Sequence, residues 1–474
     1  MMYQDFKDLF STLMVSLPLT SHRVRFQKVE HTFSSEEAIT NLGSLKFSQS
    51  NRMPDPKDPS RIVTTTTTTT FSMAKEMARS VCHRFLEARF IDSVDGKTDF
   101  SSKSAVWQLT PKGMHILQRF CQRNGINQRH VYDLLDSPRN TMHLVILERE
   151  NETDRLHRDQ ATIEVIFRRF AGAEPNVKTS TSASDSDSLN DYVTGLVGVK
   201  LAKERKVGDR VLWNTFTGKA AVDWLLDCCT MVDKREAFEL ASLFTQYNMI
   251  QHIAPNGERD NRTGFNPSKT AIYSFTEKGQ RVAGWVSPST SSANGDNSTL
   301  RAREGTARDS NANRMQVIVN DPALRLLFRE FLRDTHCEEN LSFYLDVKIF
   351  LEQYKNAKKS SSSPKLETIR ETLAAAYSLY NAFLAPGSPC ELNIDYTLRT
   401  ALAARMTRAV GDDEAMIKSL DEVASLFDQA QTSVFKLMAS DSVPKFMREP
   451  KYTSVIHERN LDVALAAPTR TSTS

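Results

Sequence analysis

Apolar residues recur at helical spacing through the C-terminal third of the chain. An aspartate and a proline, Asp321 and Pro322, precede the first such stripe, which consists of Leu324, Leu327, Phe328, Phe331 and Leu332. Aspartate is a favoured N-cap and proline suits the first helical position, so a helix is predicted to begin there. Similar stripes predict further helices from about Glu338, over about Leu366–Phe383, and through Val423–Met438. Residues 314–455 are therefore predicted to form an all-α bundle.

A different pattern occurs twice ahead of this bundle. Residues 31–42 align with 214–225, residues 74–91 with 234–253, and residues 107–113 with 273–279. Each copy begins with a capped helix, continues with a second helix, and ends with a β-hairpin whose last strand contains an aromatic residue. This order is that of a winged helix. The fold predicted for the whole chain is multidomain, with two winged-helix α/β modules followed by the all-α bundle.

Polar low-complexity tracts separate these blocks. Residues 178–191 and 287–299 are rich in Ser, Thr, Asp and Asn, and they are predicted to be flexible linkers. Shorter tracts at Thr64–Thr70 and Lys358–Pro364 are predicted to be surface-loop insertions. The predicted boundaries are a first module at 20–120, a helical connector at 126–176, a linker at 177–191, a second module at 195–285, a linker at 287–310 and the bundle at 314–455.

Composition and charge narrow the class of protein. The 474 residues are 40% hydrophobic and 25% charged, which is typical of a soluble protein with several domains. The six cysteines are scattered without metal-ligand spacing, so free thiols are expected, and no metal or cofactor is expected. No apolar run is long enough to cross a membrane, and the N-terminus lacks a signal-peptide core. A cytoplasmic protein is expected.

Winged helices often bind DNA, so that alternative has to be weighed against the charges. In the second module Lys234 and Arg235 share their helix with Glu236 and Glu239, and the net charge of the chain is only +3. Specific DNA binding needs a cluster of cations to contact phosphates, so no nucleic acid partner is expected. A separate basic run suits an acidic lipid surface or an acidic receptor tail, although it is also compatible with a solvated helix face. This run consists of Lys200, Lys203, Arg205, Lys206 and Arg210.

The polar residues at three breaks between the helices of the bundle are the most informative part of the chain. These are Glu338-Glu339-Asn340, Asn393-Ile394-Asp395 and Asp441-Ser442-Val443-Pro444-Lys445-Phe446. Taken singly, each residue is an ordinary helix-capping or turn residue. In this order and spacing they resemble the RGS domain, and the two modules resemble the DEP domain. The whole arrangement is similar to fungal regulators of G-protein signalling that have a DEP–DEP–RGS architecture.

The resemblance implies a partner and a site. RGS domains grip the switch regions of a heterotrimeric G-protein α subunit (Gα) and accelerate its GTP hydrolysis, so the chain is expected to be a GTPase-activating protein and not itself an enzyme. Asn393 is expected to reach toward the catalytic glutamine and switch segments of Gα. Carried over by position, the Gα-binding residues are Glu339, Asn340, Asn393, Asp395, Leu437, Asp441, Ser442 and Lys445.

The resemblance also implies a setting. DEP modules of similar proteins target receptor tails or membranes, so peripheral recruitment to the plasma membrane is expected. The biology implied is attenuation of a Gα pathway in a fungus, which controls growth versus asexual sporulation.

Three positions depart from the RGS pattern. Cys337 stands where the family usually has a helix-capping serine, Lys445 where many members have arginine, and His336 where an aromatic residue is common. The departures at Cys337 and Lys445 favour an alternative, in which an RGS-fold scaffold binds Gα or a receptor without stimulating hydrolysis.

Overall fold

The computed structural model divides the chain into two compact units. The first consists of residues 1–46, 70–118 and 128–298, and the second of residues 47–69, 119–127 and 299–474. The residues that the structure describes are 3–54, 62–126, 128–150, 153–178, 192, 194–207, 210–254, 259–260, 264–286, 304–359, 366–388, 390–408, 413–458 and 465. Both predicted linker tracts, except for a few residues at their edges, lie outside the described residues.

The first repeat is an α/β module built around an antiparallel sheet with strand order β1-β2-β6-β5. Its elements are α1 (Tyr3–Ser16), β1 (Thr20–Val24), β2 (Gln27–Ser34), α2 (Ser35–Gly43), α3 (Lys75–Glu87), β5 (Ile91–Ser93), β6 (Val106–Leu109) and α4 (Pro111–Asn124). The predicted helix cap at its start is confirmed, since Ser34 and Glu37 form a capping box on α2.

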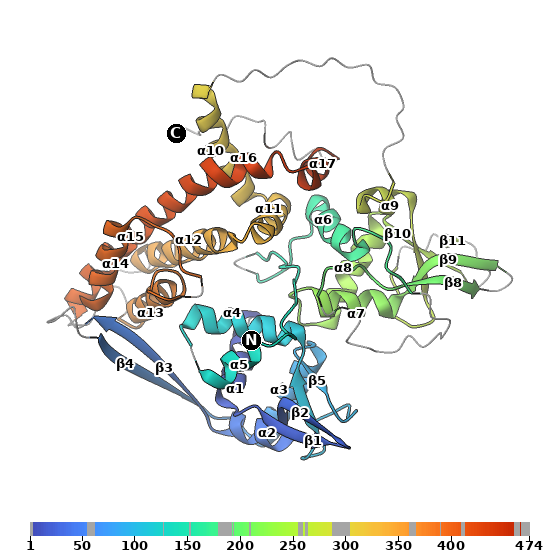
Figure 1. Cartoon of the computed structure of the whole chain (residues 1–474), viewed down its shortest axis with the longest axis horizontal. Coiled ribbons are helices and arrows are strands. Elements are labelled where there is room, and N and C mark those ends of the chain that lie inside the picture. Colours follow the sequence, from blue (N-terminus) through green and yellow to red (C-terminus); the bar gives the residue numbers. More distant parts are fainter. Residues whose placement is uncertain are drawn as a thin grey trace. The chain divides into compact units, whose positions relative to one another are not determined.

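The second repeat has the same order of elements (Figure 1). They are α6 (Gln160–Ala171), β8 (Leu201–Val207), β9 (Arg210–Thr217), α7 (Gly218–Cys228), α8 (Lys234–Gln246), β10 (Ile250–Ile253), β12 (Ile272–Phe275) and α9 (Glu277–Ala283). Two short strands, β7 (Val177–Lys178) and β11 (Arg259–Asp260), complete a sheet of order β11-β10-β12-β9-β8-β7. The helical stripe predicted for α8 is confirmed, because Ala237, Leu240, Ala241 and Phe244 are all buried.

The two copies also share atomic details. Thr110 in the first and Thr276 in the second each donate a side-chain hydrogen bond of 2.6 Å to a backbone carbonyl at the end of the preceding helix–strand turn. Gly113 and Gly279 follow three residues later, and a Cβ atom on either would lie 2.0 Å from a backbone oxygen. Only glycine fits such a close approach, so the Thr-Pro-Lys-Gly and Thr-Glu-Lys-Gly segments of the repeat have a steric explanation.

Helix α6 contributes to the core of the second repeat. The segment predicted as a connector, 126–176, contains α5 (Arg129–Leu135) and α6. Phe170 of α6 is fully buried, and its ring centroid lies 5.1 Å from that of Phe244, 5.4 Å from Trp224 and 5.7 Å from Phe216. Helix α6 therefore supplies a central aromatic of the same core as β9, α7 and α8.

Charged side chains join the two repeats within the first unit. Arg89 Nη2 lies 3.0 Å from Asp223 Oδ1 of α7. The buried Lys112 Nζ donates to the carbonyl oxygens of Leu226 and Met231, the second at 2.6 Å. Burial lowers the pKa of Lys112 to about 8, because the ammonium has lost its water. The hydrogen bonds to two carbonyls offset part of that desolvation and tie α4 to the C-terminal end of α7.

The threonine-rich tract differs from its prediction. Thr64–Thr70, predicted to be a surface loop, lies in strand β4 (Ile62–Phe71), which pairs with β3 (Leu45–Pro54) in a two-stranded sheet. The loop prediction was wrong because threonine is β-branched, and a run of β-branched residues favours extended backbone over an irregular loop.

The bundle of the second unit is all helical. It contains α10 (Glu304–Asn320), α11 (Pro322–Asp334), α12 (Glu338–Lys359), α13 (Leu366–Phe383), α14 (Tyr396–Arg408), α15 (Asp413–Leu437), a π-helical turn η2 (Met438–Ser442), α16 (Val443–Phe446) and α17 (Pro450–Glu458). Helices α12, α13 and α15 pack on one another, and α14 packs on α15 (Figure 1). Phe343, Phe350, Phe427 and Val434 are among the buried residues of this core.

The helix boundaries predicted for the bundle are confirmed. Asp321 caps α11 by accepting a hydrogen bond from the Leu324 backbone N–H, and Pro322 occupies its first turn. Helix α12 begins at Glu338, and α13 spans Leu366–Phe383. The tract Lys358–Pro364 contains the end of α12, and its remaining residues lie outside the described part of the chain.

Candidate functional site

The first of the three helix breaks separates α11 from α12. His336 has a positive φ of 56° there, which turns the chain sharply. The Asn340 side-chain amide donates to the carbonyl oxygen of Cys337 at 3.3 Å and to Glu339 Oε1 at 3.1 Å. Cys337 does not replace a serine cap, since its thiol points to the carbonyl oxygen of Thr335 at 3.3 Å. The Asn340 amide therefore ties the start of α12 to the break by donating hydrogen bonds.

The second break, between α13 and α14, presents Asn393. Its neighbours Leu392 and Ile394 are buried, whereas Asn393 is exposed. Asp395 accepts hydrogen bonds from the backbone N–H groups of Thr397 at 2.9 Å and Leu398 at 3.2 Å, and so caps α14. Hydrogen bonds from the Thr397 hydroxyl and from these N–H groups lower the pKa of Asp395, because they stabilise the carboxylate.

The third break follows α15 and is π-helical. Leu437, at its start, is 44% exposed, and Asp441 is exposed as well. Lys445 Nζ lies 2.8 Å from Asp441 Oδ1, one helical turn away. Ser442 is buried, so it faces the bundle. Single π-helical turns inside helices often mark functional positions, because they change the direction of the following side chains.

Two thiols at the breaks have raised pKa values, and residues of other breaks contribute to them. Burial raises the pKa of the Cys337 thiol, and the carboxylates of Glu339 and Asp441 raise it further. Burial also raises the pKa of Cys390 in the second break, where Glu339 again contributes. Glu339 of the first break therefore affects a thiol in its own break and one in the second, and Asp441 of the third break affects the thiol of the first.

A cluster of guanidinium groups holds the start of α12. Glu338 lies 2.6 Å from Arg119, 3.3 Å from Arg333 and 4.0 Å from Arg329, all of them residues of the second unit. Burial alone would raise the pKa of Glu338, but the three guanidinium groups outweigh it and lower the pKa to about 2. The cluster fixes the helix end that carries Glu339 and Asn340.

The Glu338 cluster makes the stability of the bundle depend on pH. A pKa lowered from 4.5 to about 2 stabilises the fold fully above pH 4.5, and this contribution is lost as the pH falls toward 2. We expect Glu338→Gln to destabilise the bundle by roughly 3 kcal/mol at pH 7 and much less at pH 2 to 3. Urea unfolding at both pH values measures this difference. Glu352→Gln, an exposed position on the same helix, is the control and should change little. An equal loss for Glu338→Gln at both pH values would contradict the assignment.

Three family models match this chain. The model of the Regulator of G protein signaling domain (RGS) covers residues 314–455, and the DEP model, named for Dishevelled, Egl-10 and Pleckstrin, covers residues 198–275. The chain carries a DEP domain and an RGS domain. A third model, the fungal-differentiation regulator winged helix domain, covers residues 5–137 and so matches the first repeat. The predicted order of two winged helices and a helical RGS domain is confirmed.

Three relatives are similar to different portions of this chain. The chain is 65% identical over 97% of its length to the developmental regulator flbA of Emericella nidulans, and it spans 64% of the length of that protein. It is 26% identical to Regulator of G-protein signaling 1 of Schizosaccharomyces pombe, covering 94% of this chain and 88% of the relative. Human Regulator of G-protein signaling 8 is 33% identical over 132 residues, which are 28% of this chain and 58% of the relative. The predicted resemblance to fungal regulators of G-protein signalling is confirmed.

The basic run of the DEP domain lies on the hairpin β8–β9 and not on a helix, so the helix-face alternative is wrong. Strand pairing places Glu204 opposite Trp213 and Lys206 opposite Val211, on one face of the hairpin. Trp213 is 58% exposed and Val211 45% exposed. On the strands, Lys203, Lys206 and Arg210 are exposed and Arg205 is half-buried, while Lys200, which directly precedes β8, is half-buried. The hairpin therefore combines cations with exposed apolar side chains.

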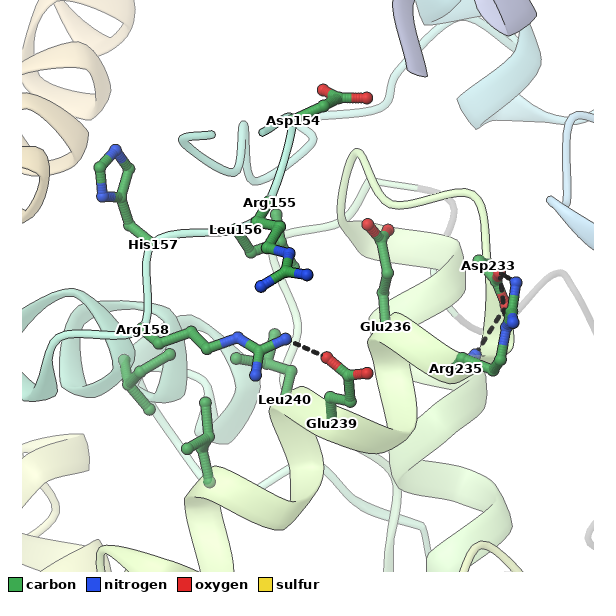
Figure 2. Close-up of a pocket in the computed structure, with 12 residues that line it drawn as sticks. Asp154, Arg155, Leu156, His157, Arg158, Asp233, Arg235, Glu236, Glu239 and Leu240 are labelled. Atoms are coloured by element: carbon green, nitrogen blue, oxygen red, sulfur yellow. Dashed lines mark hydrogen bonds and ion pairs between the residues drawn. The ribbon is translucent and has the colours of Figure 1, made fainter. Parts of the chain in front are cut away.

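A polar cavity of about 300 Å³ lies beside α8 of the DEP domain. Figure 2 shows Arg158 reaching toward Glu239 from the segment that precedes α6. Arg149 forms two 2.8 Å contacts with Glu236. These ion pairs fasten the segment to α8, whose charges are then largely neutralised. The charges along α8 are of mixed sign, unlike the cationic face that DNA binding needs.

Sequence reasoning missed two exposed aromatics near the predicted sites. Tyr396, which follows Asp395 directly, is 78% exposed, and Trp213 lies on the basic hairpin. Strand alternation was the available signal for Trp213, because Phe216 and Trp213 lie on opposite faces. Tyr396 is the first residue of helix α14, where side chains are commonly exposed. The hydrophobic pattern of the sequence therefore did not single it out. Among the described residues, no group of three or more His, Cys, Asp or Glu side chains has the arrangement of a metal site.

Proposed function

We propose that this chain is a GTPase-activating protein for a heterotrimeric G-protein α subunit. The observation that supports the proposal is the match of the RGS model to residues 314–455, which contain all three helix breaks. Asn393, Leu437 and Asp441 are exposed at the second and third breaks. The Gα-binding set is Glu339, Asn340, Asn393, Asp395, Leu437, Asp441, Ser442 and Lys445, in which the buried Ser442 acts by packing.

The chemistry of hydrolysis belongs to the α subunit in this proposal. Gα already carries an arginine in cis and a glutamine that orients the attacking water. The contribution of the RGS domain is to hold the switch segments in their transition-state geometry, and each tenfold in rate corresponds to ~1.4 kcal/mol. Such a surface must itself be rigid. Asp395 caps α14, and Arg399 binds both Glu391 and the Leu392 carbonyl, so Asn393 extends from a fixed loop. We assign no catalytic residue to the chain itself.

A scaffold that binds Gα without stimulating it is the second candidate. Lys445 favours it, because Lys445 already pairs with Asp441 and offers no bidentate contact as arginine would. Cys337 favours it too, since it leaves the first break without a serine cap. Both features weaken binding more directly than they alter the transition state. We therefore keep GTPase activation as the main proposal.

State-selective binding tests the choice of partner. A protein that stabilises switch segments in transition-state geometry binds Gα·GDP·AlF₄⁻ more tightly than Gα·GDP. We expect the full chain to bind the aluminium fluoride complex at least tenfold more tightly, as measured by calorimetry. Equal affinity for the two states would argue against GTPase activation. If Gα bound to a non-hydrolysable GTP analogue also has this same affinity for the chain, the scaffold would be favoured.

The biological setting follows from the relatives. The Emericella relative is a developmental regulator by name, and the Schizosaccharomyces relative is a regulator of G-protein signalling. We infer that this chain attenuates a Gα pathway in a fungus, and thereby controls growth versus asexual sporulation.

The DEP domain would bring the chain to its partner at the plasma membrane. No described helix is long and apolar enough to cross a bilayer, so recruitment would be peripheral. We infer that the hairpin β8–β9 supplies it, with Lys203, Lys206 and Arg210 facing acidic lipids or an acidic receptor tail. Trp213 adds an apolar ring that suits the membrane interface.

Charge reversal on this hairpin should weaken recruitment. A basic residue near an anionic surface contributes about 1 kcal/mol, so Lys206→Glu should lower binding to phosphatidylserine vesicles roughly fivefold or more. Flotation of the full chain with such vesicles measures the bound fraction. Lys269→Glu is the matched control, because Lys269 is an exposed lysine of the same domain outside the hairpin. Equal losses for the two variants would mean that net charge, and not the hairpin, determines binding.

A further inference from the structure

The hairpin of the first winged helix has an unusual turn. Strands β1 and β2 pair with Val24 opposite Gln27, so Arg25 and Phe26 form a two-residue connection. Such turns need a positive φ at the first central residue, and they favour Asn-Gly, Asp-Gly or Gly-containing pairs. Arg25 has a φ of 55°, in a region that arginine seldom adopts. The corresponding pair between β8 and β9 in the sequence is Gly208-Asp209, an ordinary turn pair.

Arg25 and Phe26 are poor residues for this turn, which suggests that they are needed there for another purpose. Local rules are broken most often at functional sites, where a side chain is needed in spite of its conformational cost. Arg25 and Phe26 are held at the apex of a hairpin whose strands pair regularly from His22–Val29 to Val24–Gln27, next to the turn. The presence of Arg25 and Phe26 at the apex is thus better explained by a contact with another molecule than by the geometry of the turn.

Phe26 is the most exposed large apolar side chain in the described part of the chain, at 94%. Single exposed apolar residues are common on protein surfaces, so this exposure alone decides nothing. Its position does matter, because an apex side chain meets any approaching surface first. A phenyl ring there can leave water without any rearrangement of the fold.

Cations surround this ring. The seven residues from His22 to Lys28 include Arg23, Arg25 and Lys28 and no acidic residue. Lys28 pairs with Glu30 at 2.8 Å, but both side chains are more than half exposed, so the pair is weak. Arg23 and Arg25 are exposed, and among the described residues neither has an ion-pair partner. The apex therefore carries an apolar ring within a cationic rim.

We propose that this apex, residues 23–28, is a docking site for an anionic lipid bilayer. Phe26 enters the boundary between headgroups and acyl chains, and the guanidinium groups of Arg23 and Arg25 bind lipid phosphates beside it. Lys28 adds a third cation, and the methylene groups of these side chains lie along the apolar layer.

A bilayer fits this apex better than a protein partner does. Stable protein interfaces use about 20 to 30 residues a side, whereas the apex offers about six. A flat anionic surface needs only a few cations and one inserted ring to hold a protein reversibly. An acidic peptide would contact the cations but would have no use for Phe26, and that difference separates the two in an experiment.

The second hairpin makes this site more effective. Hairpin β8–β9, in the same compact unit, carries Val211 and Trp213 with its own cations. One weak membrane contact gives only marginal attachment, and two contacts on one body are retained much longer. The apex proposal does not depend on β8–β9, and it is independent of the activity proposed for the RGS domain.

Vesicle flotation of the full chain tests the proposal. Burying a phenyl ring corresponds to roughly tenfold in partitioning, so Phe26→Ala should lower binding to phosphatidylcholine–phosphatidylserine vesicles about tenfold. Met77→Ala is the matched control, because Met77 is 60% exposed on α3 of the same module. The same pair of variants in a Trp213→Ala background measures the apex without the second hairpin.

A further variant separates binding from folding. Arg25→Gly should relieve the left-handed residue and leave the melting temperature unchanged or higher, while it lowers vesicle binding about fivefold. A melting temperature that stays equal or rises while vesicle binding falls would support the site. Wild-type binding by Phe26→Ala in the Trp213→Ala background would overturn the proposal. A loss of binding with Arg25→Gly that Phe26→Ala does not share would also overturn it, since charge dependence without ring insertion indicates an acidic partner of another kind. No binding of the wild type to anionic vesicles at low salt would overturn it as well.

Discussion

Replacing Asn393 by alanine should reduce the stimulation of Gα GTP hydrolysis by at least tenfold and leave the fold intact. The side chain is exposed between the buried Leu392 and Ile394, so its loss creates no cavity. A hydrogen-bonding group that acts only in the transition state lowers the barrier by ~1.4 kcal/mol for each tenfold in rate. Single-turnover hydrolysis with increasing concentrations of the chain measures both the maximal rate and the apparent affinity.

Gln353→Ala is the matched control for this experiment. Gln353 is an exposed amide near the far end of α12, outside the three breaks. It should stimulate hydrolysis as the wild type does, and the melting temperatures of both variants should match that of the wild type. Full stimulation by Asn393→Ala would remove Asn393 from the site, even if the chain is a GTPase-activating protein.

The second large effect concerns stability. Phe170→Ala should destabilise the DEP core by about 3 to 5 kcal/mol, because it leaves a cavity among Trp224, Phe216 and Phe244. Amide hydrogen exchange of α7 and α8 in the full chain should then rise together, since α6 packs in the same core. The change lies outside the residues matched by the DEP model, 198–275, so it tests whether α6 is part of the DEP fold.

Phe238→Ala provides the comparison. Phe238 is also on the DEP domain, in α8, but it is 39% exposed and should cost about 1 kcal/mol or less. If the two phenylalanines were equally dispensable, α6 would be a connector that touches the DEP domain without supporting it. Faster exchange confined to α6 in Phe170→Ala would lead to the same conclusion.

Local chemistry made the RGS bundle predictable from the sequence. Asp321 and Pro322 mark a helix start through hydrogen bonding and a fixed φ, and both occupy those roles in the structure. The repeat was predictable for a similar reason. Gly113 and Gly279 occupy equivalent positions where a backbone oxygen lies too close for any side chain. Such features act within a few residues, and the sequence therefore contains all of the information that they need.

Contacts between distant segments were not predictable in this way. The helical stripe of α6 predicts a buried face, but only the fold shows that Phe170 meets Trp224 across a long interval of sequence. Arg119 next to Glu338 is a pair of the same kind, separated by 219 positions. The alternation that makes the basic run a strand was obscured, because Lys, Arg and Glu occupy both faces of β8. Ser442 was grouped with exposed residues, whereas the π-helical turn buries it.

The structure changes the expected roles of the site residues more than it changes the expected fold. The three helix breaks supply the assigned residues in two layers, an exposed one with Asn393 and Leu437 and a supporting one with Asp395 and Ser442. Substitutions in the supporting layer should act through rigidity, and substitutions in the exposed layer through contact.

Single-turnover GTP hydrolysis by a purified fungal Gα subunit of the inhibitory class, with and without the full chain, tests the central claim most directly. We predict a clear acceleration that saturates with the concentration of the chain and is lost in Asn393→Ala. An unchanged hydrolysis rate, measured with a chain that binds the aluminium fluoride complex of the same α subunit, would contradict GTPase activation and favour a scaffold.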